Sequence, residues 1–476
     1  MNARRILRRP LQLVQAWINP PTSRAAPLDQ SPEDGRSSER NRRAALTMAV
    51  GFASRTVGIV ASLVSVPILL RYLGVEFYGV WLTIMAGSAW LALVQFGIAP
   101  SLVNRLSALD SGAPADRASL VSTAWWLEIV IAGAALIPLA VLYNLAPWHS
   151  LFNLPPGQMA DDARAVTAIV WLGLAVSLPA SLPAAVLRAA QEGYTVSILE
   201  MMGALARLAA IVVVVVVDAG VVALAIAYTL AGLSSSAAAA VYVFARRFRD
   251  ALPSIRHVSL RVAGSLLSTG SGFTMIAVAA IVISYTDVIV ITQVLGPASV
   301  PAYAIAYTLL QVFVGLEMLV LDAAWPGYVE AAARGDHRWI RTTHRRLTRL
   351  FLVGPCVFAI GLIVLGQPLI RVWAGADVVP PFSLLATLAV LAVVQAYQLP
   401  HGRLLTSLGH VRFNAGLGML SAAINLPLSI ILARQLGITG VALGTLIGYL
   451  VIGGFLVARA RRTLAELAPE TCAEGC

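Results

Sequence analysis

The stretch AAIVVVVVVDAGVVALAIAYTL, residues 209–230, shows the pattern that decides the fold. Two apolar runs are separated here only by Asp218-Ala219-Gly220. Extended in both directions, each run reaches the length of about 20 residues that crosses a bilayer as a helix. A helix satisfies its own backbone hydrogen bonds, which hydrocarbon cannot do. We therefore expect two membrane-spanning helices joined by a tight turn.

Composition extends this expectation to the whole chain. Hydrophobic residues make up 58% of the 476 positions and charged residues only 12%, with a mean hydropathy of +0.80. A soluble domain carries about twice that charged fraction. So apolar a chain cannot face water on all sides, and lipid must be part of its solvent. The composition predicts a polytopic membrane protein and argues against a soluble enzyme.

Twelve apolar segments predict an all-α fold of about twelve transmembrane helices. They lie near residues 44–70, 77–99, 119–143, 164–187, 196–217, 220–245, 264–294, 299–323, 350–370, 380–402, 410–433 and 438–458. The polar, arginine-rich N-terminus is expected to be a disordered tail or to lie on an anionic membrane surface. The predicted organisation is a basic cytoplasmic tail (1–43), an N-terminal six-helix lobe (44–245), a basic cytoplasmic linker (246–263), a C-terminal six-helix lobe (264–460) and a cytoplasmic tail (461–476).

Arginine placement predicts the orientation. All 34 basic residues are arginine, and 28 of them fall in segments that are cytoplasmic if the N-terminus is inside. Four lie in the outside loops, and two, Arg55 and Arg207, lie within spans. Because cytoplasmic loops are enriched in basic residues, we expect both termini in the cytoplasm. The basic loops are too short to follow a phosphate backbone, which argues against nucleic acid as a partner.

The two halves of the chain carry corresponding turns. Leu73-Gly74 ends the first predicted span and Leu295-Gly296 ends the seventh. Likewise, Asp218-Ala219-Gly220 between the fifth and sixth spans corresponds to Gln435-Leu436-Gly437 between the last two. With an even number of spans per half, the repeat is parallel, with its pseudo-axis along the membrane normal. Transporters with this organisation bind substrate between the halves and rock one half against the other.

Motifs for catalysis or cofactor binding are missing from the sequence. The longest outside loop, near 144–163, has no acid–base pair at useful spacing. No P-loop or dinucleotide fingerprint occurs. The three cysteines give no disulfide framework, and the six histidines lack metal-ligand spacing. We therefore expect no enzyme activity, no cofactor and no metal site.

Ionisable residues inside the spans are the candidate functional residues, because a mid-bilayer charge costs about 2.5–3.5 kcal/mol on insertion scales. Arg55 could contact an anionic substrate in a central cavity or form an ion pair with a carboxylate such as Glu128. Arg207 could do the same, with Glu200 as its possible ion-pair partner. Asp287 could pair with an arginine across the lobes, or take up a proton or cation as the coupling group.

Several motifs resemble those of the polysaccharide-export flippases, the Wzx-type O-antigen translocases of the multidrug/oligosaccharidyl-lipid/polysaccharide (MOP, MATE-like) superfamily. They are PILLRYLGVEFYGVW (67–81), FGIAPSLVN (96–104), LRAAQEG (187–193), DVIVITQVLG (287–296) and GITGVALG (437–444). The first is fairly specific, whereas the last occurs widely in the superfamily that includes multidrug antiporters and the lipid II flippase. The resemblance runs from about residue 45 to 460.

The resemblance implies two six-helix lobes, alternating access, and an undecaprenyl-pyrophosphate-linked oligosaccharide as cargo. It also implies a bacterial cytoplasmic membrane, a cationic central cavity, often with ion coupling, and contact with polysaccharide polymerase or assembly proteins. Arg55 matches the first-helix cavity arginine of lipid II flippases, although those proteins usually have fourteen helices and more cavity arginines. The alternative function is a MATE-like ion-coupled multidrug or metabolite antiporter. A glycan polymerase or ligase would need a large outside loop, which is missing.

Overall fold

The protein is described by a computed structural model, which covers residues 32–109 and 114–467. Within these ranges the structure is helical and contains no strand. The chain divides into two compact units, Met1–Leu46 and Thr47–Cys476. The second unit contains nearly all the apolar helices. Most of the predicted N-terminal tail (1–31) and the end of the C-terminal tail (468–476) lie outside the described residues.

The α-helices follow one another with short connections. They are α2 (Pro32–Leu91), α3 (Ile98–Ser107), α4 (Pro114–Leu145), α5 (Trp148–Leu151), α6 (Gln158–Ala180), α7 (Leu182–Ala189), α8 (Gly193–Val217), α9 (Gly220–Val241), α10 (Leu260–Leu295), α11 (Val300–Ala333), α12 (His337–Trp373), α13 (Phe382–Ser407), α14 (Val411–Leu436) and α15 (Ile438–Glu466). A π-helical turn, Tyr242–Arg247, and two 3-10 turns, Arg249–Ala251 and Ile255–His257, connect α9 to α10.

Ten helices among the described residues are long and apolar enough to cross a membrane. Helix α2 counts there as one, although Gly74 interrupts it with non-helical angles (φ 72°, ψ 167°) and divides it into two predicted spans. Helix α10, with 36 residues, is long enough to be the predicted seventh span. These two helices account for the difference from twelve, and the expected multi-pass, all-α membrane fold is confirmed.

The corresponding turns of the two halves share a backbone conformation. Gly296 (φ 89°, ψ 157°) ends α10 with nearly the angles that Gly74 has within α2. Such positive φ values are readily accessible only to glycine. At the other pair of turns, Gly437 has a φ of 62° and Gly220 a φ of 87°. At Gly74 and Gly296 the repeat in the sequence is therefore also a repeat of backbone geometry, whereas α8 ends at Asp218 in a left-handed conformation that the end of α14 does not share.

Helix α2 begins earlier than the sequence analysis expected. Residues 32–43 were assigned to the tail, but the helix that forms the first span already starts at Pro32. Arginine and glutamate, frequent in this segment, are good helix formers. A proline in the first turn is also well tolerated because its missing N–H has no partner there in any case. The local propensity of this segment thus favours helix despite its polar composition.

Apolar cores show where the two halves of the second unit are joined. The largest core combines residues from both halves, including Phe77 and Trp81 of α2, Tyr303 of α11 and Leu384 of α13. We call this region, which lies around the Gly74 and Gly296 turns, the shared end. Three smaller cores, one of them around Tyr328, consist almost entirely of residues from one half each. We call the region where these cores lie the split end.

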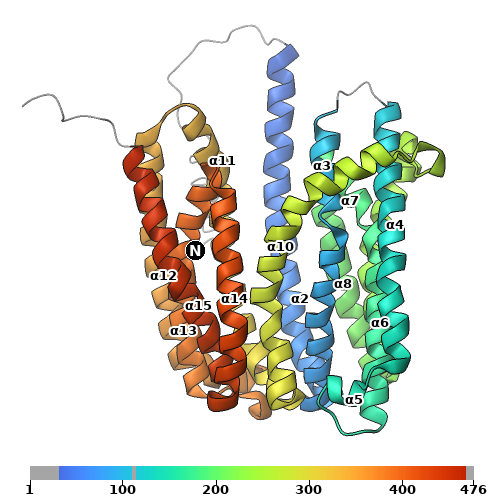
Figure 1. The fold of residues 1–476 in the computed structure, drawn as a ribbon, viewed down its shortest axis with the longest axis vertical. Helices are drawn as coiled ribbons and strands as arrows, with labels where there is room; N and C mark the ends of the chain where they lie inside the picture. Colours follow the sequence, from blue (N-terminus) through green and yellow to red (C-terminus); the bar gives the residue numbers. More distant parts are fainter. Residues whose placement is uncertain (1–31, 110–113, 468–476) are drawn as a thin grey trace, which may run out of the picture. The chain divides into compact units, whose positions relative to one another are not determined.

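Helix α10 connects the two halves at the split end (Figure 1). Its beginning packs on α3 and α4, where Leu266 belongs to the core formed by Ile98 and Leu102. Its later part packs on α14 and α15. Gly270 makes the first contact possible, because a Cβ there would lie 2.1 Å from the carbonyl oxygen of Phe96. The predicted boundary of the C-terminal lobe at residue 264 therefore falls within a helix that touches both halves.

Candidate functional site

An ion group joins the two halves at the split end. Arg55 lies on α2, and its Nη1 is 3.6 Å from Oδ2 of Asp322 on α11. Arg403 on α13 donates from Nη2 to Oδ1 of the same carboxylate, at 2.8 Å. Two guanidinium groups, one from each half, therefore converge on one carboxylate and leave an excess of one positive charge.

The side chains of this group are open to different degrees. Arg403 is only 17% exposed, and its guanidinium lies 4.6 Å from the ring centroid of Trp325 and 3.8 Å from the sulfur of Met318. Arg55 is 55% and Asp322 42% exposed. Arg55 and Asp322 thus contact each other from different halves, and each keeps about half of its side chain exposed.

Arg55 does not have the carboxylate partner that the sequence analysis named. Glu128 lies on α4 and is fully buried. Neither of its carboxylate oxygens has a hydrogen-bond partner among the described residues. The Arg55–Glu128 pairing is therefore wrong, because Arg55 faces α11 of the other half and pairs with Asp322. Asp322 is a shared partner of two arginines.

Arg207 and Glu200 are not paired with each other either. Both lie on α8, seven residues apart, which separates them by about 10 Å along a helix axis. Glu200 instead accepts from Arg188 at 2.8 Å. The guanidinium of Arg207 lies 5.9 Å from the ring centroid of Tyr228 on α9, within the N-terminal half. The described residues give no contact between Arg207 and the Arg55 group, so a role in substrate binding stays a prediction.

Asp287 on α10 is enclosed by hydroxyl groups of the C-terminal half. It accepts hydrogen bonds from Tyr303 of α11 (2.6 Å), Thr445 of α15 (2.9 Å) and Ser429 of α14 (3.4 Å). All four side chains are buried. Asp287 thus has hydroxyl partners in its own half in place of the arginine across the lobes that the sequence analysis considered.

An unused acceptor lies next to this carboxylate. Asn425 on α14 donates from its Nδ2 to the hydroxyl of Thr445 at 2.7 Å, whereas its buried Oδ1 has no hydrogen-bond partner among the described residues. A buried carboxylate without a cation is costly. Carboxylate, hydroxyl and amide oxygens are the ligands that hard cations prefer. The residues around Asp287 could therefore hold a proton or a small cation.

Helix α2 carries a second inter-half contact at the shared end. Pro67 has no N–H, so it leaves the carbonyl of Leu63, four residues earlier, without its helical donor. The indole N–H of Trp373, at the end of α12, donates to this oxygen at 3.0 Å. A side chain of one half thereby replaces a backbone bond missing in the other. Thr83 and Thr292 add a hydroxyl–hydroxyl bond between the halves.

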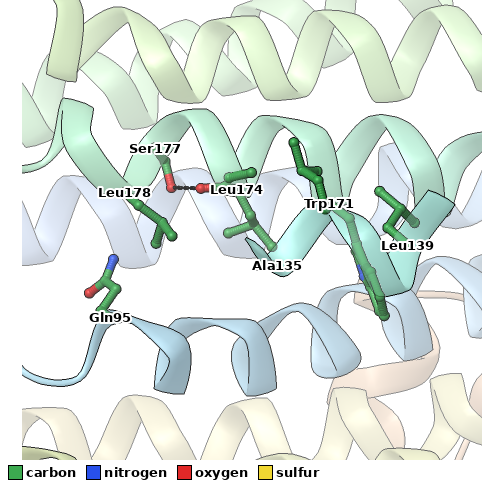
Figure 2. A pocket seen from close by; sticks show the side chains of 9 residues that line it. Gln95, Ala135, Leu139, Trp171, Leu174, Ser177 and Leu178 are labelled. Carbon is green, nitrogen blue, oxygen red and sulfur yellow. Dashed lines mark hydrogen bonds between the residues drawn. The ribbon is translucent and has the colours of Figure 1, made fainter. Parts of the chain in front are cut away.

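A small pocket lies inside the N-terminal half (Figure 2). Its lining is Gln95, Ala135, Leu136, Leu139, Trp171, Leu174, Ala175, Ser177 and Leu178. The hydroxyl of Ser177 is already used, since it donates to the carbonyl oxygen of Leu174 at 2.7 Å. None of the lining residues is charged. The pocket is therefore mostly apolar, with the amide of Gln95 and the indole N–H of Trp171 as its polar groups, and has no charge to bind an ion.

Sequence reasoning missed Arg403, Trp325 and the partners of Asp287. Arg403 was assigned to a cytoplasmic loop, yet α13 continues to Ser407 and carries it inside the helix. One signal was available for the Asp287 group, because Asn425 and Ser429 are polar residues four positions apart in an apolar segment. Such spacing puts two side chains on one face of a helix.

Comparisons with known proteins show the family of this chain. A family model described as "Polysaccharide biosynthesis protein" matches residues 68–379. A Salmonella typhi protein named "Putative O-antigen transporter" is 26% identical over 316 residues, which cover 66% of this chain and 70% of that protein.

Two solved structures show the same fold at low sequence identity. A multidrug resistance MATE-family transporter of the MOP superfamily, in its inward-facing conformation, aligns with a TM-score of 0.71 at 15% identity, over 91% of this chain and 100% of that one. The lipid II flippase MurJ aligns with a TM-score of 0.69 at 12% identity, over 89% of each chain.

Proposed function

The chain belongs to the polysaccharide biosynthesis protein family, and we propose that it moves an undecaprenyl-pyrophosphate-linked oligosaccharide across the bacterial cytoplasmic membrane. Its product would supply the synthesis of a surface polysaccharide. A charged sugar headgroup cannot cross hydrocarbon alone, so it needs a polar route while the lipid tail stays in the bilayer. The O-antigen transporter name of the Salmonella typhi relative supports this cargo class.

The observation that carries this proposal is the ion group of Arg55, Asp322 and Arg403. It lies between the halves, where a parallel-repeat transporter binds its substrate, and it has an excess of positive charge. Arginine suits a pyrophosphate because its planar fork donates two hydrogen bonds and stays charged. In our proposal the phosphate groups bind Arg55, and the sugars occupy the space between the halves.

Transport would proceed by alternating access. The arginine distribution supports a cytoplasmic position for the split end and an outside position for the shared end. With the halves joined by a common apolar core at the shared end, the described state would admit substrate from the cytoplasm. Both termini would then lie in the cytoplasm. To release the substrate, the halves would part at the shared end, breaking contacts such as that between Trp373 and Leu63.

Asp287 is the candidate coupling group in this cycle. Its partners come from α11, α14 and α15, so a proton or cation bound there would change how four helices of one half pack together. A ligand shifts a conformational equilibrium only through different affinities for the two states. Ion binding at Asp287 would therefore favour one orientation of the C-terminal half.

Complementation of a flippase-deficient strain tests the function. We expect the wild-type chain to restore surface polysaccharide, and Arg55→Ala at equal expression to restore at most about a tenth of it, since charge-assisted bonds to phosphate are among the stronger ones. Arg188→Ala, which breaks the exposed pair with Glu200, is the matched control and should behave as wild type. Restoration by Arg55→Ala to the wild-type level would rule out this role of Arg55.

The alternative, a multidrug or metabolite antiporter, is separated by the same strains. An antiporter would raise the resistance of a pump-deficient strain to cationic drugs without restoring surface polysaccharide. No described observation favours it, since the arginines between the halves would repel a cationic drug. The likeness to the MATE transporter, at 15% identity, concerns the fold alone.

A further inference from the structure

The ion group contains one carboxylate for two guanidinium groups, and each oxygen of Asp322 is directed to a different arginine. A carboxylate is the closest side-chain equivalent of one face of a phosphate. Arg55 and Asp322 are also about half exposed, so their pairing is worth little in water. An incoming anion with more charge and more acceptor oxygens can displace such a weakly held carboxylate.

We propose, on the premise of the function above, that Arg403 is a second substrate-binding arginine and that Asp322 occupies the anion subsite in the absence of substrate. Arg55 and Arg403 would bind the anionic headgroup from opposite halves, and Asp322 would be displaced from between them. The ligand chemistry is a di-anionic phosphate or diphosphate. Asp322 thereby sets a threshold, because a neutral or weakly charged solute cannot compete with it.

The environment of Arg403 supports this role. Its guanidinium is held over the ring of Trp325 and beside the sulfur of Met318, so it is already positioned without its carboxylate partner. Cation–π contact of this kind holds the guanidinium in place while its Nη2 donates to Asp322. Trp325 itself is 39% exposed, so this support for Arg403 lies at the surface of the protein.

Displacement of Asp322 has a consequence for the two halves. In the described state the carboxylate bridges α2 of one half and α13 of the other through its two arginines. A bound diphosphate would make the same bridge with more contacts. Substrate would thus hold the split end together more firmly than Asp322 does, which favours the closure that must precede opening of the shared end.

Binding measurements on the full chain in nanodiscs of phosphatidylcholine test this subsite. The probes are farnesyl diphosphate, inorganic pyrophosphate and uncharged farnesol. We expect Asp322→Asn to bind farnesyl diphosphate about fivefold more tightly than wild type, as expected for removal of a weak competing pair. Arg403→Ala should bind it about tenfold more weakly, and Arg403→Lys should fall between. Farnesol binding should not respond to any of these changes.

Affinity changes of opposite sign in Asp322→Asn and Arg403→Ala distinguish an anion subsite from a purely structural ion pair. Asp322→Asn and Arg403→Ala break the same contact, so a purely structural role would change affinity in the same direction. Glu330→Gln, which breaks the exposed pair with Arg334 on α11, is the control and should leave the affinity unchanged. Asp322→Ala provides a second test should the Asn variant fail to fold.

Several outcomes decide between the possibilities. If pyrophosphate follows the same order as farnesyl diphosphate, the subsite recognises the free anion; if only farnesyl diphosphate does, it recognises a lipid headgroup, and either result supports the proposal. Unchanged or weaker binding by Asp322→Asn and Asp322→Ala would overturn it. If the binding measurements overturn the subsite but the wild-type chain complements the flippase-deficient strain, the proposed function still stands. If only complementation fails, the proposed function is removed and the anion subsite is not.

Discussion

At Gly79 the lack of a side chain lets α2 touch the turn that follows α10 in the other half. A Cβ at this position would lie 1.9 Å from the carbonyl oxygen of Pro297, a backbone atom that cannot move aside as a side chain would. Glycine costs a helix up to about 1 kcal/mol relative to alanine. The close approach of the two halves at the shared end therefore explains a residue that helix propensity disfavours.

Gly79→Ala should consequently destabilise the protein by about 1–3 kcal/mol, as overpacking of a well-packed site does. Gly87→Ala is the matched control on the same helix, since a Cβ there meets no atom within 4 Å. Thermal unfolding of both purified variants in detergent measures the difference. A melting temperature for Gly79→Ala equal to that of Gly87→Ala would contradict the described contact with Pro297.

Asp287 permits a second prediction at the same scale. Asp287→Leu leaves the hydroxyl of Tyr303 without its acceptor, and a buried unsatisfied group costs about 1–3 kcal/mol. Ser429 and Thr445 keep the carbonyl oxygen of Val441 as an acceptor. We expect a clear loss of thermal stability for this variant. Asp287→Asn keeps the size and one acceptor oxygen, so it should melt close to wild type while transport in vesicles loses its dependence on an ion gradient. Gradient-dependent transport by Asp287→Asn would exclude the coupling role.

At the scale of helices, Pro67 and Trp373 show how a kink in α2 is linked to the end of α12. A proline inside α2 frees a carbonyl, and the end of α12 supplies the missing donor from the other half. A kink within one helix therefore becomes a contact between two bundles. The contact is a single hydrogen bond, worth about 1 kcal/mol, so it can form and break during a transport cycle.

Trp373→Phe should weaken the shared end by about that amount, because the ring remains but the N–H is lost. Spin labels at the exposed positions Val216 and Val372, on α8 and α12, would report a larger population of long distances. Trp90→Phe is the control, since the indole N–H of Trp90 has no hydrogen-bond partner among the described residues. Pro67→Ala should act in the same direction by returning a helical donor to Leu63, and its effect should not add to that of Trp373→Phe.

At the scale of the whole molecule, the number of spans and the distribution of arginines together predict which loops lie outside and which lie in the cytoplasm. With Cys356, Cys472 and Cys476 replaced by serine, a cysteine at Pro156 should react with a membrane-impermeant thiol reagent applied from outside. A cysteine at Arg338 should react only after the cytoplasmic membrane is permeabilised, because its turn carries many arginines. The reverse pattern would invert the proposed orientation. Reaction of both from outside would contradict the odd number of predicted spans, five, between them.

The fold could be predicted from the sequence to a large extent. The length of the apolar runs, the glycine turns and the repeat at Gly74 and Gly296 follow from local physics, because hydrocarbon requires each segment to satisfy its own backbone. The early start of α2 and the course of α10 could not be read so directly. Polar residues near Pro32 were assigned to a tail, and nothing in the sequence of α10 indicates that it packs on both halves.

The candidate site could be predicted only in part. Arg55 and Asp287 stood out because charge is rare in apolar segments, and that rule needs no knowledge of neighbours. Their partners required the fold. Glu128 and Glu200 were reasonable choices by sequence, yet Asp322 and Arg188 are the observed contacts. Arg403 escaped notice because its helix extends further than its apolar run.

By itself, the sequence determined that this chain lies in a membrane as a repeat of helical spans, because hydropathy and backbone hydrogen bonding act within each segment. Only the tertiary structure decided which charges meet, where the halves join and which oxygens surround Asp287. These contacts link residues far apart along the chain, such as Arg55 and Asp322. They depend on distances of a few ångström between helices, which no local pattern of residues encodes.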